Sequence, residues 1–350
     1  MPRLRNAIIN LALVLLSLVA GLGMLELGIR AASPNASVLQ WRNLLDQPLM
    51  TFGTMPFLRY DSEIGYVIDP DGRRFGLSLG PLGNRLDHTP PAGQAIPAPA
   101  PNSILAVGDS FVYGSEVEDD ETWPALLGAS IMGQSVVNAG VGGWGLDQIT
   151  LWAKRLIPVL KPPLVLVGIN PFVLERCELS RFAGMPKPYF RLTDEGVEMC
   201  NVPVSPPQPR PPLDLLRRVL GYSYLAYSMT ERLGLGDAWR LTRYARTVEH
   251  HDGAAVACHL IRQLDATTRS VGGRLVVVLQ VARGHLHDPV AMTALNTIRD
   301  CAAMAVTVID TRPDFAALPD QDLERMFAPG GHLSAAGNRL VAKHLATELR

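Results

Sequence analysis

A single serine stands where this chain could carry out nucleophilic chemistry. Ser110 follows the apolar run Ile104–Val107 and the pair Gly108-Asp109. The apolar run predicts a short buried strand, and ligands of open α/β sheets bind beyond the carboxyl ends of such strands. Glycine, aspartate and serine are also common in ordinary turns, so this stretch alone leaves a purely structural turn open. Catalysis would require a base for the serine proton and donors for an oxyanion.

Three further segments supply groups of those kinds. The glycine-rich loop at Gly142 and Gly143 follows a second predicted strand, and Asn170 follows a third. The carboxyl ends of parallel strands meet at one sheet edge, so a backbone N–H of the glycine loop and the side-chain amide of Asn170 are candidate oxyanion donors. His332 lies among small neighbours just before the last predicted helix, and it is the candidate base.

The other histidines do not predict a metal site. His344 falls within the last predicted helix. The histidines at 250 and 251 and at 285 and 287 have no carboxylate or cysteine framework at ligand spacing. No C-x-x-C motif is present either. We therefore expect neither a metal ion nor another cofactor.

Short apolar runs alternate with helical stretches along much of the chain. Strands are predicted at 104–107, 135–138, 164–168, 274–280 and 305–309, and helices at 146–160, 256–271 and 288–303. Thr122 is the predicted N-cap of one more helix and Ser334 that of the last one. This alternation is typical of an α/β protein whose parallel sheet is covered on both faces.

Four blocks of the sequence, taken in order, resemble those of the SGNH hydrolases, the GDSL-like esterase and acyltransferase superfamily. They are residues 108–110, 137–143, 168–170 and 332–337. The resemblance extends over about 104–170 and 256–350, and it implies a three-layer α/β/α sandwich with a five-stranded parallel, flavodoxin-like sheet. The site residues that it implies are Ser110 as nucleophile with Asp109 in support, Gly143 and Asn170 at the oxyanion, and His332 as base.

The sequence departs from the family pattern at two positions. Pro171 follows Asn170 where the family has aspartate, which leaves the chemically needed amide in place. Pro329 stands where the family has the aspartate that orients the histidine. Three interpretations are open: a serine–histidine dyad held by a backbone carbonyl, a distant acid, or little or no hydrolytic activity. The candidate distant acids are Asp310, Asp314, Asp320, Asp322 and Glu324.

The N-terminal part of the chain predicts a membrane anchor. Residues 7–25 are nearly all apolar, and their length as a helix approaches the ~30 Å hydrocarbon core of a bilayer. A removed signal peptide is the alternative, with 31–33 as its cleavage site. Arg3 and Arg5 precede the apolar stretch, so we expect a cytoplasmic N-terminus. The remainder would lie on the periplasmic or extracellular side of a bacterial inner membrane.

Three parts of the chain are distinguished by composition. Residues 1–30 are predicted as a cytoplasmic tip and transmembrane helix, 31–103 as an irregular preamble with a Pro- and Ala-rich spacer, and 104–350 as the hydrolase-like domain. Residues 171–250 interrupt the strand–helix alternation of that domain. We expect them to form a lid or substrate wall, and a loop without contact to the site is the alternative.

Composition and cysteine content bear on partners and compartment. Apolar residues make up 47% of the chain and charged residues 19%, and the formal net charge is −1. Without a basic stripe, nucleic acid is not an expected partner. The four cysteines lie in the part predicted to be exported, where disulfides persist. We expect pairs Cys177–Cys200 and Cys258–Cys301, with four free thiols as the alternative.

These features predict a membrane-anchored serine esterase or O-acyltransferase that works through an acyl group on Ser110. The expected substrate is an ester-linked acyl group, acetyl in the first place, on an envelope or extracellular carbohydrate, because some relatives implied by the resemblance modify polysaccharides. The alternative is a weak or inactive SGNH-like domain that binds carbohydrate or acts as a scaffold in an envelope assembly. A cytoplasmic dehydrogenase is disfavoured, because the loop at 140–145 lacks G-x-G-x-x-G spacing and follows the second strand.

Overall fold

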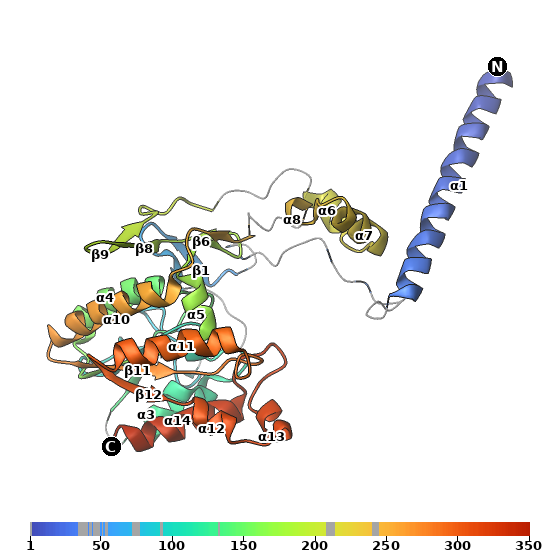
Figure 1. Cartoon of the computed structure of the whole chain (residues 1–350). Coiled ribbons are helices and arrows are strands. Elements are labelled where there is room, and N and C mark those ends of the chain that lie inside the picture. The colour runs from blue at the N-terminus through green and yellow to red at the C-terminus, as the bar shows by residue number, and fades with distance from the viewer. Residues whose placement is uncertain are drawn as a thin grey trace. The chain divides into compact units, whose positions relative to one another are not determined.

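The chain divides into two compact units, which we describe separately (Figure 1). The first comprises Met1–Leu49 and Gln208–Arg246, and the second Met50–Pro207 and Thr247–Arg350. The computed structural model describes residues 2–33, 55–71, 78–91, 94–131, 134–207, 214–239 and 245–350, together with Trp41, Leu44, Met50 and Phe52. Parts of the predicted preamble, such as 34–40 and 72–77, lie outside the described residues.

The second unit is built on a five-stranded parallel sheet in the order β12–β11–β5–β3–β4. The strands are β3 (Ile104–Val107), β4 (Val136–Asn138), β5 (Leu164–Ile169), β11 (Arg274–Leu279) and β12 (Thr307–Asp310). Successive residues of a strand point to opposite faces, and both faces of β3 and β5 are buried. The near-continuous apolar runs in the sequence therefore reflect a sheet covered on both sides.

Helices cover the two faces of this sheet and complete a three-layer α/β/α sandwich (Figure 1). One apolar cluster packs α4 (Leu146–Leu160), α10 (Gly253–Arg269) and α11 (Pro289–Ala302) against one face. The other cluster packs α3 (Trp123–Ser130) and α14 (Ala335–Glu348) against the opposite face. The predicted fold class, with its parallel sheet and N-terminal apolar helix, is confirmed.

Side-chain caps fix several helix starts where the sequence predicts them. Thr122 accepts a hydrogen bond from the Ala125 N–H at the start of α3, and Ser334 accepts one from Gly337 at the start of α14. Asp288 caps α11 in the same way. Such caps satisfy backbone N–H groups that a helix leaves unpaired at its first turn.

The segment before the sheet is more regular than expected. β1 (Leu58–Asp61) and β2 (Gly65–Ile68) form an antiparallel hairpin whose second strand is fully buried. Arg155 on α4 holds the hairpin turn through ion pairs with Asp61 and Glu63. Hydrogen bonds from Arg155 lower the pKa of Asp61 to about 2 against the opposing effect of its partial burial.

The predicted insertion contributes to both units. Within the second unit, β6 (Leu179–Phe182) pairs with β7 (Met185–Pro186) and with β10 (Thr247–Val248), and β8 (Tyr189–Thr193) pairs with β9 (Gly196–Cys200). Short elements complete this unit: α2 (Ser110–Tyr113), η1 (Asp119–Glu121), α5 (Pro171–Arg176), α12 (Arg312–Ala316) and α13 (Asp320–Arg325).

The first unit combines the N-terminal helix α1 (Pro2–Ala32) with α6 (Asp214–Leu220), α7 (Tyr224–Arg232) and α8 (Gly236–Trp239). α6 and α7 are separated by the short turn that begins at Gly221. One apolar helix, Arg3–Ala32, is long enough to cross a membrane by length and composition. Near its end, Glu26 accepts hydrogen bonds from the N–H groups of Tyr224 and Leu225 at the start of α7.

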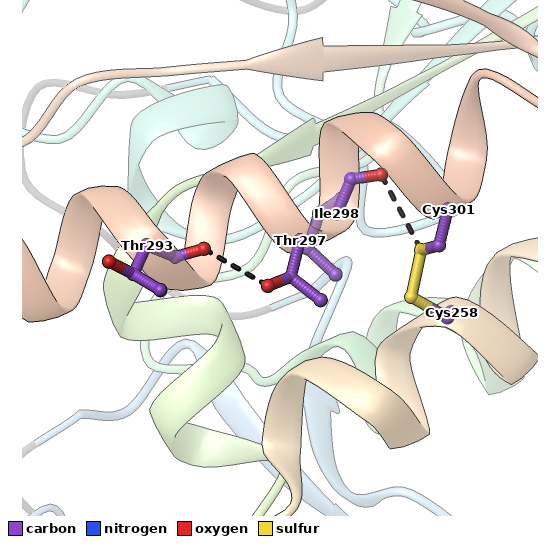
Figure 2. Close-up of a disulfide and its surroundings, with 5 residues drawn as sticks. All are labelled: Cys258, Thr293, Thr297, Ile298 and Cys301. Atoms are coloured by element: carbon purple, nitrogen blue, oxygen red, sulfur yellow. Dashed lines mark hydrogen bonds between the residues drawn. A yellow bond between two sulfur atoms is a disulfide. The ribbon is translucent and has the colours of Figure 1, made fainter.

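A disulfide between Cys258 and Cys301 joins α10 to α11, with a Cα–Cα distance of 6.0 Å (Figure 2). This predicted pair is confirmed. The predicted pair Cys177–Cys200 is wrong, because both thiols are free. Cys177 is buried against the end of α5, and Cys200 lies part-exposed on β9. Burial raises the pKa of the Cys177 thiol far above its usual value, so this thiol is unreactive.

Candidate active site

Ser110 lies at the first position of the short helix α2, directly beyond the end of β3. The preceding Asp109 caps this helix by accepting a hydrogen bond of 3.0 Å from the Phe111 N–H. Gly108 is required for the close turn, since a Cβ there would lie 2.1 Å from a methyl group of Val112. The tight strand–helix turn therefore places the serine side chain at the carboxyl edge of the sheet.

The order of the strands makes this edge a natural place for a binding site. The chain runs from β3 to β4 on one side and then returns to β5 on the other side of β3. Ligands of doubly wound sheets bind at such a switch point. Ser110 follows β3 and Asn170 follows β5, so both candidate residues flank the switch.

His332 reaches Ser110 from the loop that joins α13 to α14. A backbone hydrogen bond of 2.8 Å from Ala328 N–H to the His332 carbonyl closes this loop. The His332 Nε2 atom lies 2.9 Å from Ser110 Oγ, across 222 positions of sequence. This is the separation at which an imidazole can accept the serine proton.

The other imidazole nitrogen contacts Glu116, a residue that the sequence reasoning did not select. His332 Nδ1 lies 2.6 Å from Glu116 Oε2. The Gly330 N–H donates to Glu116 Oε1 at 2.7 Å, and the His332 N–H donates to Oε2 at 3.4 Å. A carboxylate here fixes the ring orientation and the tautomer that leaves Nε2 free to accept a proton.

The environment of Glu116 keeps its carboxylate ionised. Partial burial alone would raise the pKa of Glu116, but hydrogen bonds from the His332 side chain and from the Gly330 and His332 N–H groups outweigh it. The pKa of Glu116 therefore lies below its ordinary value of 4.5. Near neutral pH, the group that faces the imidazole is an anion.

The distant acids expected from the sequence do not serve His332. Asp310 pairs with Arg312, Asp314 with His344, Asp322 with Arg325, and Glu324 with Arg283. Asp320 begins α13. A backbone carbonyl is not the partner of Nδ1 either, because Glu116 occupies that place. The dyad and the five named acids are therefore wrong, whereas a distant acid does face the imidazole, and it is Glu116.

No sequence signal singles out Glu116, although its backbone conformation is unusual. The residue follows Gly114 closely, and both have positive φ angles, 71° at Glu116 and 80° at Gly114. The left-handed backbone of a non-glycine residue is uncommon and is concentrated at functional sites. The sequence does not reveal that angle, and Glu116 precedes the histidine by 216 residues.

The predicted glycine loop lies beside Ser110 and is held by the preamble. The position of a Cβ on Gly142 would be 3.8 Å from the Cβ of Ser110. Tyr66 of β2 donates its hydroxyl to the Gly142 carbonyl at 3.1 Å. Since the peptide is planar and trans, the Gly143 N–H points away from Tyr66. Gly143 has φ of +82°, and a side chain there would come within 2.8 Å of the Tyr66 hydroxyl.

Asn170 is fully buried and has two structural contacts. Its Oδ1 accepts from the Val173 N–H at 3.2 Å and caps α5, and its Nδ2 donates to Asp109 Oδ1 at 3.0 Å. The amide nitrogen carries two hydrogens, and this bond uses one of them. Pro171, which departs from the family pattern, occupies the first turn of α5, where proline is favoured.

Asp109 is buried and connects three groups of the site through its carboxylate. Its Oδ1 accepts from Phe111 N–H and from Asn170, and its Oδ2 pairs with Arg176 at 2.9 Å. The structure thus brings together Ser110, His332, Asp109 and Asn170, with the glycine loop alongside. No group of three or more His, Cys, Asp or Glu side chains suited to a metal ion gathers among the residues that the structure describes.

Comparison with known proteins finds similarity in structure only. No family model matches the chain, and no curated protein matches it. A member of the lipolytic protein G-D-S-L family from Veillonella parvula DSM 2008 is 13% identical, with a TM-score of 0.42 over 70% of this chain and 96% of that one. A catalytic mutant of an acetylxylan esterase from Geobacillus stearothermophilus is 13% identical, with a TM-score of 0.41 over 72% and 95%.

A third solved structure, an alpha/beta hydrolase enzyme from the metagenome of Lake Arreo, Spain, is also 13% identical and has a TM-score of 0.42 over 72% of this chain and 97% of that one. The first of these three structures carries the name of the family that the sequence blocks resemble. The function proposed below rests on the geometry around Ser110, because similarity at this level says nothing about substrate.

Proposed function

We propose that this protein is an SGNH-type serine esterase or O-acyltransferase. The observation that carries the proposal is the chain of contacts from Ser110 Oγ to His332 Nε2 at 2.9 Å and from His332 Nδ1 to Glu116 Oε2 at 2.6 Å. A serine, an imidazole and an ionised carboxylate in this order form the arrangement that activates a hydroxyl for acyl transfer.

The first half of the reaction forms an acyl-enzyme. Ser110 Oγ attacks the carbonyl carbon of an ester while His332 Nε2 takes the hydroxyl proton. The tetrahedral intermediate then collapses, the bond to the alcohol oxygen breaks, and His332 returns the proton to the leaving alcohol. Glu116 remains ionised throughout and stabilises the imidazolium, as the lowered pKa of Glu116 favours.

The second half repeats these steps with a new acceptor. Water attacking the acyl-Ser110 ester gives hydrolysis, and a sugar hydroxyl gives transfer. The candidate oxyanion donors are the N–H groups of Ser110 and Gly143 and the free hydrogen of Asn170 Nδ2. The hydrogen bond from Tyr66 to the Gly142 carbonyl supports this assignment, because it orients the peptide that carries the Gly143 N–H.

The proposed substrate is a small ester-linked acyl group, acetyl in the first place, on an envelope or extracellular carbohydrate. The pocket beside Ser110 and His332 has a volume of about 420 Å³, which accommodates an acetylated sugar unit and not a long polymer in full. A polymer would therefore present one unit at a time across the open mouth of the pocket.

We further propose that α1 remains attached as a membrane anchor. Arg30 near its end is 1% exposed, and its guanidinium stacks at 4.2 Å on Trp41 and at 4.8 Å on Tyr224. Cleavage at 31–33 would remove Arg30 and the Glu26 carboxylate that caps α7. The Cys258–Cys301 disulfide supports the proposal that the second unit is exported, because disulfides persist in oxidising compartments.

The alternative function, an inactive scaffold or carbohydrate-binding domain, depended on the missing acid. Glu116 occupies the position of that acid, and we therefore favour the enzyme.

Turnover of a simple ester tests the proposal. The full-length protein in detergent or nanodiscs should hydrolyse p-nitrophenyl acetate, and Ser110→Ala should reduce kcat by about 10³-fold or more. Equal turnover by wild type and Ser110→Ala would contradict the mechanism. Supplying a sugar acceptor and separating acetate from acetylated sugar then distinguishes hydrolysis from transfer.

A further inference from the structure

The pocket beside the reacting serine has an unusual balance of charge. Besides Ser110 and His332, its wall includes two arginines, Arg176 and Arg283. No carboxylate lines it among the residues that the structure describes. A substrate entering this space meets cationic groups on the wall, while the acids that neutralise them lie behind or outside it.

Arg176 is nearly buried, and only one of its three side-chain nitrogens donates hydrogen bonds within the protein. Its side chain is 12% exposed, and only Nη1 has hydrogen-bond acceptors, Asp109 Oδ2 at 2.9 Å and the Trp144 carbonyl at 3.3 Å. Its Nε and Nη2 atoms have no protein acceptor among the described residues. These three N–H groups therefore reach the open space of the pocket beside the nucleophile, where they are available to a ligand.

Aromatic rings hold the guanidinium of Arg176 in place. Its central carbon lies 5.4 Å from the ring centre of Phe172 and 4.8 Å from that of Phe182. The ion pair to Asp109 fixes one edge of the planar group, and the rings restrict its tilt. The open edge is therefore preorganised, which lowers the entropy cost of binding a planar oxyanion through two parallel hydrogen bonds.

Two other buried cations in the same unit have a protein partner at every side-chain nitrogen, and Arg176 differs from them. Arg85 donates through Nε to Asp119 and through its remaining nitrogens to the carbonyls of Tyr113, Gly114 and Val117. Lys187 pairs with the buried Asp147 and donates to three backbone carbonyls. Cations that serve the fold alone use their donors within the protein, whereas Arg176 keeps an edge free at the pocket.

Arg283 adds a second, more exposed cation. Its Nη2 pairs with Glu324 at 2.5 Å, and its side chain is 44% exposed. A pair exposed to this extent contributes little to stability and exchanges readily with other anions. Arg283 can therefore turn from Glu324 toward a ligand, while Arg176 provides the fixed contact.

We propose that Arg176, assisted by Arg283, binds an anionic group of the substrate beside the ester that Ser110 attacks. This group is a carboxylate or a phosphate and is distinct from the oxyanion of the tetrahedral intermediate. The proposal rests on the esterase or acyltransferase function above and names its substrate class. The acyl group would be carried by an anionic carbohydrate, such as an acetylated uronic acid or sugar phosphate. Neutral esters would be poorer substrates because they offer no anionic group to the guanidinium of Arg176.

Matched aryl acetates test the subsite. The substrates are 4-acetoxybenzoate, its neutral methyl ester and 4-acetoxyphenyl phosphate. To correct for intrinsic reactivity, the kcat/KM of each ester is divided by the rate constant for hydrolysis of that ester by hydroxide. Wild type should prefer a charged ester by about tenfold or more. The ratio, and not the absolute rate, is the readout, because it cancels general losses of activity.

Variants locate the origin of the preference. Arg176→Gln should bring the charged-to-neutral ratio close to one, Arg283→Gln should reduce it partly, and Arg176→Lys should retain part of it as a point charge. Arg191→Gln is the matched control, since this arginine pairs with Glu198 on β8–β9 and does not line the pocket, and its ratio should equal that of wild type. In wild type, the charged ester that is preferred over the neutral one, the benzoate or the phenyl phosphate, identifies the bound group as carboxylate or phosphate.

A measurement on wild type keeps the test decisive if Arg176 variants fail to fold. Benzoate or inorganic phosphate should slow fluorophosphonate labelling of Ser110, and benzamide at the same concentration should not. Turnover of all three esters with equal normalised rates would overturn the subsite and leave the proposed function standing. Absence of both turnover and Ser110 labelling would overturn the proposed function itself.

Discussion

At the scale of single residues, the site is completed by an acid from an unexpected place. The family pattern places the acid just before the histidine, where this chain has Pro329. Here Glu116, only six residues after the nucleophile in the sequence, reaches the same imidazole nitrogen. Orientation of the imidazole requires a carboxylate at hydrogen-bond distance from Nδ1 and does not depend on which segment supplies it.

Replacing Glu116 should therefore damage catalysis as the loss of a triad acid does. Glu116→Gln removes the charge that stabilises the imidazolium and can hold the wrong tautomer of His332. We expect kcat to fall by about 10²–10⁴-fold with a smaller change in KM. Steady-state hydrolysis of p-nitrophenyl acetate measures this effect.

Asp314→Asn provides the matched control. Asp314 also pairs with a histidine, His344, at 2.7 Å, but on the helices away from Ser110. This variant should keep the wild-type kcat. A kcat of Glu116→Gln within threefold of wild type would contradict the role assigned to Glu116.

At the scale of elements, the preamble hairpin supports the proposed active site. Strand β2 carries Tyr66, whose hydroxyl holds the Gly142 carbonyl. Burial raises the pKa of Tyr66 well above its usual value, so the hydroxyl stays protonated and remains a donor. The hairpin thus positions the loop that we propose as an oxyanion donor.

Tyr66→Phe should lower kcat by about two- to tenfold, the effect of losing one hydrogen bond worth about 0.5–1.5 kcal/mol. KM should change little, because the loop is proposed to act on the transition state. Tyr60→Phe is the control: its hydroxyl lies on the same hairpin and donates to the Val204 carbonyl. Equal kcat values for the two variants would argue against a role of Tyr66 in positioning the loop.

The sheet and the main helices could be predicted from sequence because their signals are local. Apolar runs define the strands, and caps such as Thr122 and Ser334 define helix starts. The β1–β2 hairpin was missed because two four-residue strands carry too little pattern. The partner of His332 was missed because a contact across 216 residues leaves no periodicity.

The disulfide between α10 and α11 should be the main covalent source of stability in the second unit. It closes a loop with a sequence separation of 43 residues, so its loss should lower the free energy of unfolding by about 2–4 kcal/mol. Urea unfolding of the Cys258→Ala/Cys301→Ala variant measures this. Cys200→Ser, at a free and part-exposed thiol, should unfold like wild type. An equal decrease in the free energy of unfolding of both variants would contradict a structural disulfide at 258–301.

At the scale of the whole molecule, the N-terminal helix belongs to a folded unit. Glu26 and Arg30 connect α1 to the loop and helix at Tyr222–Leu225. A cleaved signal peptide has no reason to supply such buried contacts to the mature protein. This part of the chain was predicted as an anchor from hydropathy, but its contacts with α7 could not be predicted, because they join positions almost 200 residues apart.

The mature protein should therefore retain its first residues. Intact-mass analysis of protein from the membrane fraction should give a mass that includes Arg3 and Arg5. Alkaline carbonate should not extract the protein from the membranes. An N-terminus at 31–34 in the mature protein would contradict the anchor and support a removed signal peptide.

The most direct test of the central claim is the reactivity of Ser110 toward a fluorophosphonate. Peptide mass analysis of the labelled full-length protein should find one adduct, on Ser110. Labelling should be abolished in Ser110→Ala and slowed by about 10²-fold or more in both His332→Ala and Glu116→Gln. If Ser110 stays unlabelled, or is labelled at the same rate without His332 and Glu116, the three residues do not form a catalytic triad.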